Sequence, residues 1–228
     1  MSELYIVATP IGNLSDFSSR AVEILKSVDQ IACEDTRTSL VLLRNYGIEK
    51  PLFSFHQHNE HHKVDHLIHL LESGQSIAII SDAGMPGISD PGFLAVRAAH
   101  QHGYRVVPIP GPDALTTALA ASGLPSDRFT FEGFLPPKKG RQTRVKNISE
   151  SEITSVVYES PHKIIKLLEQ LNQFCGDNRW VCIARELTKK FEEIDRGLLG
   201  DILPAWKSRK TIKGEIVVIV AGKEYIED

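Results

Sequence analysis

The chain has 228 residues, of which 42% are hydrophobic and 24% charged, and its formal net charge is −3. This length accommodates one large α/β domain or two small ones, and the composition is that of a folded globular protein. A slightly negative charge argues against a protein that coats nucleic acid without sequence preference, while a local basic patch can still bind RNA.

Short apolar runs alternate with helical patterns along the chain. We expect strands at 4–9, 30–34, 51–55, 76–81, 105–109, 129–134, 155–160, 179–185 and 215–222, and helices near 17–28, 37–46, 60–73, 91–103, 113–122 and 161–174. Several of the strands consist almost wholly of Val, Ile and Ala, which is typical of strands covered on both faces. The alternation predicts an α/β fold with mainly parallel sheets. Because the segment AASGLPSDRF (120–129) has the composition of a junction, we expect two α/β domains, residues 1–116 and 117–228.

The cysteines and the first residues indicate a cellular compartment. Cys33, Cys175 and Cys182 form no CxxC pair and no zinc-binding spacing, so we expect free thiols in a reducing environment. The opening segment MSELYIVATP lacks the basic region and long apolar run of a signal peptide, and no stretch approaches membrane-spanning length. We therefore expect a cytoplasmic protein that does not enter a membrane.

Five of the expected strands end in turns of unusual composition. They are TPIGN (9–13), SDAGMPG (81–87), PGPDA (110–114), ESPHK (159–163) and RELTKK (185–190). Any one of them alone is best interpreted as a tight turn. Because ligands bind outside the carboxyl ends of parallel strands, the five together predict a ligand cleft lined by backbone groups. Asp82, Asp113 and Glu159 could face a cation there. The dinucleotide pattern GxGxxG and the phosphate loop GxxxxGK[ST] are both absent.

Eight segments together resemble the tetrapyrrole-methylase superfamily of S-adenosylmethionine-dependent methyltransferases. They are TPIGNLSDFSSRA, CEDTRTS, SFHQHNE, SDAGMPGISDPG, PIPGPDALTTALAASGLP, FTFEGFLPPK, VVYESPHKI and ARELTKKFEE. Within the superfamily they are similar to the branch that methylates a cytidine ribose in small-subunit (16S) ribosomal RNA, and the similarity runs from about residue 4 to about 222. The resemblance implies two α/β domains with S-adenosylmethionine held between them, a homodimer, and methylation of a 2′-hydroxyl in the decoding region.

The resemblance also implies which residues contact the cofactor, many of them through main-chain groups. They are Pro10, Ile11, Gly12, Asp82, Ala83, Gly84, Met85, Asp113, Ala114, Leu115, Tyr158, Glu159, Leu187 and Thr188.

Methyl transfer to a hydroxyl is an in-line displacement that depends mainly on placement, helped by a base within hydrogen-bond reach of the proton. The candidates for this base are Asp35, His56, Glu159 and Glu186, and the candidates for holding the RNA ribose or phosphate include Arg37, Asn59, Arg185 and Lys189. For Asp35 an equally good interpretation is a helix cap before DTRTSL. For Arg185 and Lys189 the alternative is a solvated strand end, but their position beside an expected cofactor loop favours function.

Six of the nine histidines lie between residues 56 and 69. The pairs His58–His62 and His62–His66 have the spacing that places two rings on one helix face, as in metal sites. There is no HExxH motif, and Asn, Lys and Gln alternate with the rings as on a solvated helix face. We therefore expect no metal ion here.

Two basic segments are candidates for RNA binding. KKGRQTRVK (138–146) contains Lys138, Lys139, Arg141 and Arg144, and KSRKTIK (207–213) follows later in the chain. We expect them to be loops that hold phosphates, although mobile solvated segments have the same composition. Neither contains an aromatic residue, so base stacking is not indicated.

Longer relatives in this branch continue beyond the position where this chain ends, AGKEYIED, so we expect the basic segments, a dimer or a partner to grip the RNA. Two other functions stay open. One is methylation of a tetrapyrrole or another small metabolite, and the other is a non-enzymatic S-adenosylmethionine-binding module.

Overall fold

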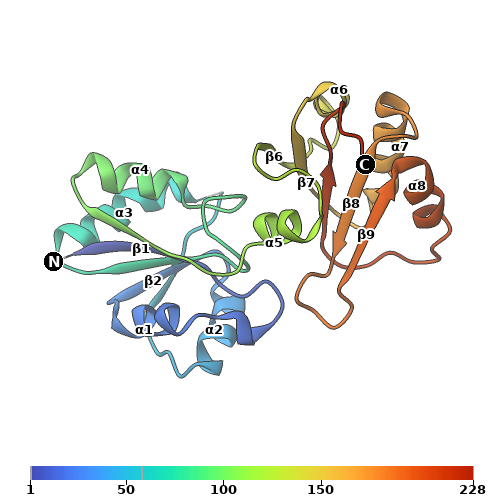
Figure 1. Ribbon diagram of the computed structural model, residues 1–228. Helices are drawn as coiled ribbons and strands as arrows, with labels where there is room; N and C mark the ends of the chain where they lie inside the picture. The colour runs from blue at the N-terminus through green and yellow to red at the C-terminus, as the bar shows by residue number, and fades with distance from the viewer. Residues whose placement is uncertain (1, 58, 228) are drawn as a thin grey trace. The chain divides into compact units, whose positions relative to one another are not determined.

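The structure, a computed structural model, describes residues 2–57 and 59–227. The chain divides into two compact units, Met1–Asp113 and Ala114–Asp228, each with its own five-stranded sheet (Figure 1). The boundary expected at 116/117 falls inside the helix that begins at Ala114, which belongs entirely to the second unit. Within the described ranges, no helix is long and apolar enough to cross a membrane.

The first unit contains a parallel sheet. Its strands are β1 (Glu3–Val7), β2 (Gln30–Cys33), β3 (Leu52–Ser54), β4 (Ile77–Ile80) and β5 (Arg105–Ile109), in the order β3-β2-β4-β1-β5. Every neighbouring pair runs parallel. All four residues of β4 are buried, as expected for a central strand covered on both faces. The predicted parallel α/β arrangement is confirmed in this unit.

Helices cover both faces of the first sheet (Figure 1). They are α1 (Ser19–Ser27), α2 (Thr36–Asn45), α3 (Glu60–Glu72) and α4 (Phe93–Gln101), with a short 3₁₀ turn at Leu14–Asp16. Successive residues of β4 point to opposite faces. Ile77 and Ile79 pack in one cluster with residues of α3 and α4, and Ala78 and Ile80 pack in another with residues of α1 and α2. Because the connections return through helices, the carboxyl ends of all five strands meet at one edge.

The second unit contains a mixed sheet. Its strands are β6 (Phe129–Phe134), β7 (Thr154–Glu159), β8 (Trp180–Arg185), β9 (Glu193–Leu198) and β10 (Ile216–Val220), in the order β6-β7-β10-β8-β9. Of the four neighbouring pairs, β6 and β7 run parallel, and the other three are antiparallel. The α/β class is confirmed, but the expectation of mainly parallel strands is wrong here. The strand β9, with the mixed sequence EIDRGL, forms a hairpin with β8, and the last strand inserts between β7 and β8.

Two helices of the second unit are not expected from the sequence. The helices are α5 (Ala114–Ala121), α6 (Arg141–Glu150), α7 (Ile164–Cys175) and α8 (Leu199–Lys207), of which α6 and α8 are the unexpected ones. Most residues of α6 are polar, yet its buried positions Arg141, Val145, Ile148 and Ser149 follow the helical period. The segment 138–146 is therefore a loop only as far as Gly140, which corrects the expectation of one continuous basic loop.

All three cysteines are free, as predicted, and Cys33 and Cys182 are buried. Burial raises the pKa of each thiol, for Cys182 to about 11. The thiols are therefore protonated near neutral pH.

Candidate functional site

The loops that follow β1 and β4 are joined at the carboxyl edge of the first sheet. The amide of Thr9 donates to the carbonyl of Gly84 (2.9 Å), and the amide of Gly84 donates to the carbonyl of Thr9 (3.0 Å). The Thr9 hydroxyl donates to the Ser81 carbonyl (3.1 Å), and both side chains are buried. The first and second predicted loops are thus fixed to each other by backbone groups.

Two glycines let the loops after β1, β4 and β5 approach closely. Gly84 has φ +84°, and a Cβ there would lie 3.4 Å from Cγ2 of Ile11. A Cβ on Gly111, in the third loop, would lie 2.9 Å from the Cβ of Ala8. Positive φ at Gly84 and the short distances to neighbouring loops at both positions favour glycine, because a side chain there would push the loops apart.

The predicted cofactor residues of the first unit lie on these loops. Gly12, Asp82 and Ala83 are exposed, Met85 and Asp113 are half-buried, and Pro10, Ile11 and Gly84 are buried. The exposed members can meet a ligand directly, whereas the buried ones fix the backbone of the loop.

Three carboxyl groups with raised pKa values lie at this edge. Burial raises the pKa of Asp82, Asp90 and Glu34, and a neighbouring carboxylate raises it further in each case. The sequence analysis included Asp82 but missed Glu34 and Asp90, because only the folded structure shows that their carboxyl groups are partly buried near each other. Carboxyl groups whose ionised form is unfavourable are suited to a cationic ligand, which would stabilise that form.

Asp35 caps α2, in agreement with the structural interpretation of its position. Its carboxylate accepts the amide of Arg37 (2.8 Å) and forms an ion pair with the Arg37 guanidinium (2.7 Å). The hydrogen bond from the Arg37 side chain lowers the pKa of Asp35 to about 2. Such a carboxylate is a weak base at neutral pH, so the structure favours the cap over catalysis.

The loop after β3 carries His56 and Asn59. The amide oxygen of Asn59 accepts the backbone N–H of His56 (2.8 Å), and its Nδ2 donates to the Ser54 carbonyl (3.2 Å). Asn59 therefore closes the loop, and its predicted contact with RNA stays a prediction. His58, and with it the pair His58–His62, lies outside the described residues. Among residues 2–57 and 59–227, no group of three or more His, Cys, Asp or Glu side chains is arranged to hold a metal ion.

In the second unit, the carboxyl ends of β7 and β8 lie at the same edge. Glu159 and Arg185, the last residues of these strands, both pair with Ile216, the first residue of β10. The loops ESPHK and RELTKK therefore emerge at one edge of this sheet, as the sequence analysis predicted for them.

Glu159 is held by a buried arginine. Its Oε2 accepts from Nη2 of Arg141 (2.7 Å), its Oε1 accepts the amide of Ser160 (2.9 Å), and both charged side chains are 3% exposed. Arg141 also donates to Gln170 of α7 (2.8 Å). This burial and pairing speak against the expected roles of Arg141 as an RNA contact and of the Glu159 carboxylate as a base. Each charge is buried and neutralised by the other.

The turn after β8 has an unusual backbone. Glu186 and Thr188 have φ of 53° and 66°, and a Cβ on Gly214 would lie 2.3 Å from Cδ of Glu186. Burial raises the pKa of Glu186, but hydrogen bonds from the Glu215 amide and from Lys189 lower it by more. Glu186 is thus an ionised anchor of the turn, which speaks against its predicted role as a base.

The other predicted residues of this edge are also held in place. The ring of Tyr158 contacts those of Phe131 and Phe134 edge-on, at centroid distances of 4.9 and 5.6 Å. Leu187 is buried. The hydroxyl of Thr188 is buried without a hydrogen-bond partner in the described part of the chain. Such a group is the kind that a bound ligand can satisfy.

Most of the predicted RNA-binding cations form ion pairs within their own unit. In the second unit Arg144 pairs with Glu132 (2.5 Å), Arg185 with Glu193 (2.8 Å), and Lys189 with both Glu186 and Glu215 (3.0 Å each). Lys138 and Lys139 are exposed, and neither has an ion-pair partner in the described ranges. Lys138 and Lys139 are therefore available to RNA phosphates, and their contact with RNA stays a prediction.

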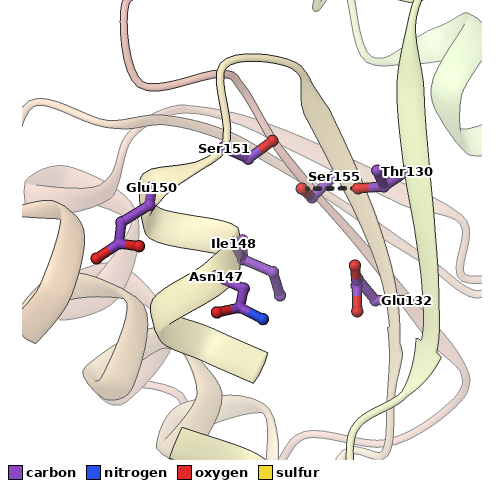
Figure 2. Close-up of a pocket in the computed structure, with 7 residues that line it drawn as sticks. All are labelled: Thr130, Glu132, Asn147, Ile148, Glu150, Ser151 and Ser155. Atoms are coloured by element: carbon purple, nitrogen blue, oxygen red, sulfur yellow. Dashed lines mark hydrogen bonds between the residues drawn. The ribbon is translucent and has the colours of Figure 1, made fainter. Parts of the chain in front are cut away.

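A pocket of about 370 Å³ lies elsewhere on the second unit (Figure 2). It is lined by Thr130, Glu132, Asn147, Ile148, Glu150, Ser151 and Ser155. Thr130 and Ser155 are the second residues of β6 and β7, so the pocket lies toward the strand ends opposite to the loops. None of the predicted site residues lines it, so the pocket is separate from the loop edge.

Two solved methyltransferases share the fold of this chain. The uroporphyrin-III-C-methyltransferase from Thermus thermophilus is 17% identical with a TM-score of 0.64, covering 98% of this chain and 96% of that one. The methyltransferase CobJ is 18% identical with a TM-score of 0.68, covering 100% and 97%. At such identities the likeness concerns the fold alone.

The sequence itself matches a family model described as Tetrapyrrole (Corrin/Porphyrin) Methylases over residues 3–203. The chain belongs to this family, which confirms the resemblance, and it is a methyltransferase that uses S-adenosylmethionine.

Curated relatives are similar over nearly the whole chain. A protein named Ribosomal RNA small subunit methyltransferase I from Escherichia coli O157:H7 is 49% identical over 229 residues, 99% of this chain and 80% of that protein. Proteins of the same name from Haemophilus influenzae and Synechocystis are 51% and 47% identical, covering 96% and 97% of this chain and 78% and 80% of their own lengths.

The loops of the first unit fit S-adenosylmethionine chemically. This cofactor carries a positive sulfonium and a positive amino group, and the edge offers carboxyl groups of Glu34, Asp82 and Asp90. The close approach of the loops at Gly84 and Gly111 keeps this edge compact. The carboxyl groups would hold the cofactor by charge, on loops that the hydrogen bonds between Thr9 and Gly84 keep in place.

Proposed function

We propose that this protein transfers a methyl group from S-adenosylmethionine to the ribose 2′-oxygen of a cytidine in the decoding region of small-subunit (16S) ribosomal RNA. The observation that carries the proposal is identity of 49% and 51% over nearly the full chain to relatives named as small-subunit ribosomal RNA methyltransferases. We choose a cytidine and its 2′-oxygen as the target because the segments CEDTRTS and VVYESPHKI resemble the branch of the family that methylates this position.

Methyl transfer from this cofactor needs little catalysis by side chains. The cofactor, when bound, supplies a methyl group already activated by the positive sulfur. The protein then has to hold the acceptor oxygen close to the methyl carbon and in line with the bond that breaks. Joined loops such as those of Thr9 and Gly84 suit this task because they are held by backbone hydrogen bonds.

Removal of the hydroxyl proton needs a base within hydrogen-bond reach of it. Asp35, Glu159 and Glu186 are each engaged by a cation. We therefore propose His56, which follows β3 at the same edge as the cofactor loops and whose side chain is the type most often used as a general base.

The RNA is expected to meet the loop edge of the second unit. Lys138 and Lys139 follow β6 at this edge as exposed cations, and phosphate neutralisation by such lysines supplies affinity without sequence preference. We also propose that Tyr158, Leu187 and Thr188 contact the adenosine part of the cofactor, and Ala114 and Leu115 its remaining part.

The protein is further proposed to act as a homodimer in the cytoplasm, where its substrate, the small ribosomal subunit, is found. Sedimentation of the purified chain at several concentrations tests the dimer, and a single species of monomer mass would contradict it.

The test of the proposed function uses S-adenosylmethionine with a labelled methyl group. Three acceptors are offered in parallel: small ribosomal subunits from cells that lack this modification, subunits from wild-type cells that already carry it, and a free tetrapyrrole. We expect label only in the RNA of the first sample. Label on the macrocycle would support metabolite methylation instead, and cofactor binding without any transfer would indicate a non-enzymatic binding module.

A further inference from the structure

The hairpin between β8 and β9 presents an aromatic ring to solvent. Phe191, in the turn of this hairpin, is 63% exposed. The ammonium of Lys190 lies 5.6 Å from the centroid of the Phe191 ring. The ring therefore has an exposed surface and a cation beside it.

The turn that carries Phe191 is held by hydrogen bonds at several points. The amide of Thr188 donates to Oε2 of Glu192 (2.6 Å), and the amide of Glu192 donates to the carbonyl of Lys189 (3.1 Å). The Lys189 ammonium contacts carboxylates of both Glu186 and Glu215 at 3.0 Å. A ring on a fixed turn loses little conformational freedom when a ligand binds to it.

The segment before β10 runs alongside this turn. Nη1 of Arg185 donates to the carbonyl of Lys213 (3.2 Å), and the amide of Glu186 donates to the carbonyl of Glu215 (2.9 Å). The second basic segment, 207–213, is thereby brought next to the hairpin, although the two are separate in the sequence.

The charges around the ring favour a polyanion. Glu186 and Glu215 share Lys189, Glu193 pairs with Arg185 and Arg209, and Asp195 also pairs with Arg209. Lys190, Lys210 and Lys213 are exposed and have no ion-pair partner within residues 2–57 and 59–227. Glu192 is also exposed, but its carboxylate accepts the Thr188 amide. The cations left over are available to phosphates.

We propose that Phe191 is a stacking platform for an unpaired base of the RNA substrate, with Lys190 and Lys213 at neighbouring phosphates. An exposed aromatic ring among unpaired cations is the combination that binds single-stranded nucleic acid. An enzyme that modifies a single nucleotide can also reach it more easily when its base lies outside a regular helix. The inference rests on the proposed function and adds a specific contact to it.

The sequence alone does not indicate stacking, because neither basic segment contains an aromatic residue. The fold supplies the missing ring from the hairpin, next to the segment 207–213.

The experiment compares Phe191→Ala, Phe191→Leu and Phe191→Trp in the full chain. The probe is a single-stranded RNA oligonucleotide containing 2-aminopurine, whose fluorescence falls when the base stacks. We expect the Ala and Leu variants to bind between about 5-fold and about 150-fold more weakly and to lose the quenching. The Trp variant should retain both. Phe174→Ala is the control, since Phe174 is 37% exposed at the end of α7, away from the loops.

The same variants are assayed for methyl transfer to small ribosomal subunits. If Phe191 stacks on a base, the Ala and Leu variants should have a higher KM for the subunit, while their affinity for S-adenosylmethionine stays unchanged. Equal quenching by wild type and Phe191→Ala would overturn the inference, as would full binding by the Leu variant. A change of sedimentation in Phe191→Ala would also overturn it, by assigning the ring to a contact between chains. Loss of the proposed function is distinguishable, because the wild-type protein would then transfer no methyl group to the subunits.

Discussion

The loops at the edge of the first sheet and those at the edge of the second are fixed by different interactions. In the first unit, backbone hydrogen bonds between Thr9 and Gly84 join the loops. In the second unit, charged side chains do so, as in the buried pair Arg141–Glu159 and in the contacts of Lys189.

This difference determines how each edge responds to change. Backbone hydrogen bonds depend little on salt or on side-chain identity, but they require glycine where φ is positive. Ion pairs depend on both partners, and a buried charge that loses its partner is strongly unfavourable. We therefore expect substitution of Gly84 to disturb the joined loops of the first sheet, and substitution of Arg141 to disturb the second unit.

The largest effect should come from breaking the buried ion pair. Arg141→Leu leaves the Glu159 carboxylate buried without its cation, and we expect a loss of about 3–5 kcal/mol in the free energy of unfolding of the second unit. Urea unfolding followed by tryptophan fluorescence measures this unit alone, because Trp180 and Trp206, the two tryptophans of the chain, both lie in it.

The double variant Arg141→Leu with Glu159→Leu is the control for this prediction. Removing both charges should restore most of the lost stability. If the double variant were as unstable as the single one, the charge pair would not be the cause.

The second-largest effect is expected at the edge of the first sheet where the loops of Thr9 and Gly84 meet. Gly84→Ala places a side chain at φ +84°, next to Ile11 and in the segment that pairs with Thr9. The strain of about 1–2 kcal/mol should move the loop and weaken S-adenosylmethionine binding by about 5-fold to 30-fold, at low and at high salt alike. Isothermal titration calorimetry measures this affinity.

Gly74→Ala is the matched control, since Gly74 has φ +89° in the same unit and nothing within 4 Å of its Cβ position. It should carry the backbone strain without the loss of cofactor affinity. Equal affinities in the two variants would contradict a role of the Gly84 loop in binding.

A third prediction concerns salt. Reversing the charges of Lys138 and Lys139 to Glu should weaken RNA binding roughly tenfold and reduce the slope of log affinity against log salt by about 1.5, with cofactor affinity unchanged. The control reverses Lys26, exposed in the last turn of α1, and Lys223, which pairs with Glu152, to Glu, an equal change in net charge outside both basic segments. Equal losses in both double variants would point to overall charge rather than to a specific contact.

The smallest effect concerns the carboxyl groups of the first edge. Burial, followed by repulsion from Asp82, raises the pKa of Asp90. The folded protein therefore binds this proton more tightly than the unfolded chain does. The resulting stabilisation is present at acidic pH and is lost as pH rises from the ordinary carboxyl range through the raised pKa.

Asp90→Asn removes the ionisable carboxyl group, and with it the loss of stability that follows its ionisation. At neutral pH we expect Tm to rise by roughly 2–4 °C, a modest value because Asp90 is partly exposed, while S-adenosylmethionine binds more weakly. Thermal unfolding across the acidic range checks the sign, with Asp65→Asn on the exposed face of α3 as control. A Tm below that of the wild type for Asp90→Asn at neutral pH would contradict the argument.

The first unit could be predicted well because its fold follows local patterns. Ile77–Ile80 is apolar throughout and ends in a loop rich in glycine, which indicates a central parallel strand and a ligand edge. The joined loops of Thr9, Ser81 and Gly84 lie where the sequence analysis placed them.

The second unit is harder to predict because its structure depends on partners distant in the sequence. Arg141 looks like a surface cation until it meets Glu159 from another element, and the polar sequence of α6 conceals its buried face. The strand β9 mixes charged and apolar residues and is stabilised by pairing with β8. Two residues of the first unit, Glu34 and Asp90, could not be identified from the sequence for a similar reason, since their raised pKa values arise from burial in the folded chain.

The position of the transferred methyl group within the nucleotide tests the proposed function most directly. Alkali cleaves RNA through the free 2′-hydroxyl, so a methylated ribose leaves an uncleaved dinucleotide. After reaction of the protein with labelled S-adenosylmethionine and small ribosomal subunits, we predict the label in an alkali-resistant dinucleotide that begins with cytidine. Label in alkali-released mononucleotides would show methylation of a base and would contradict the account.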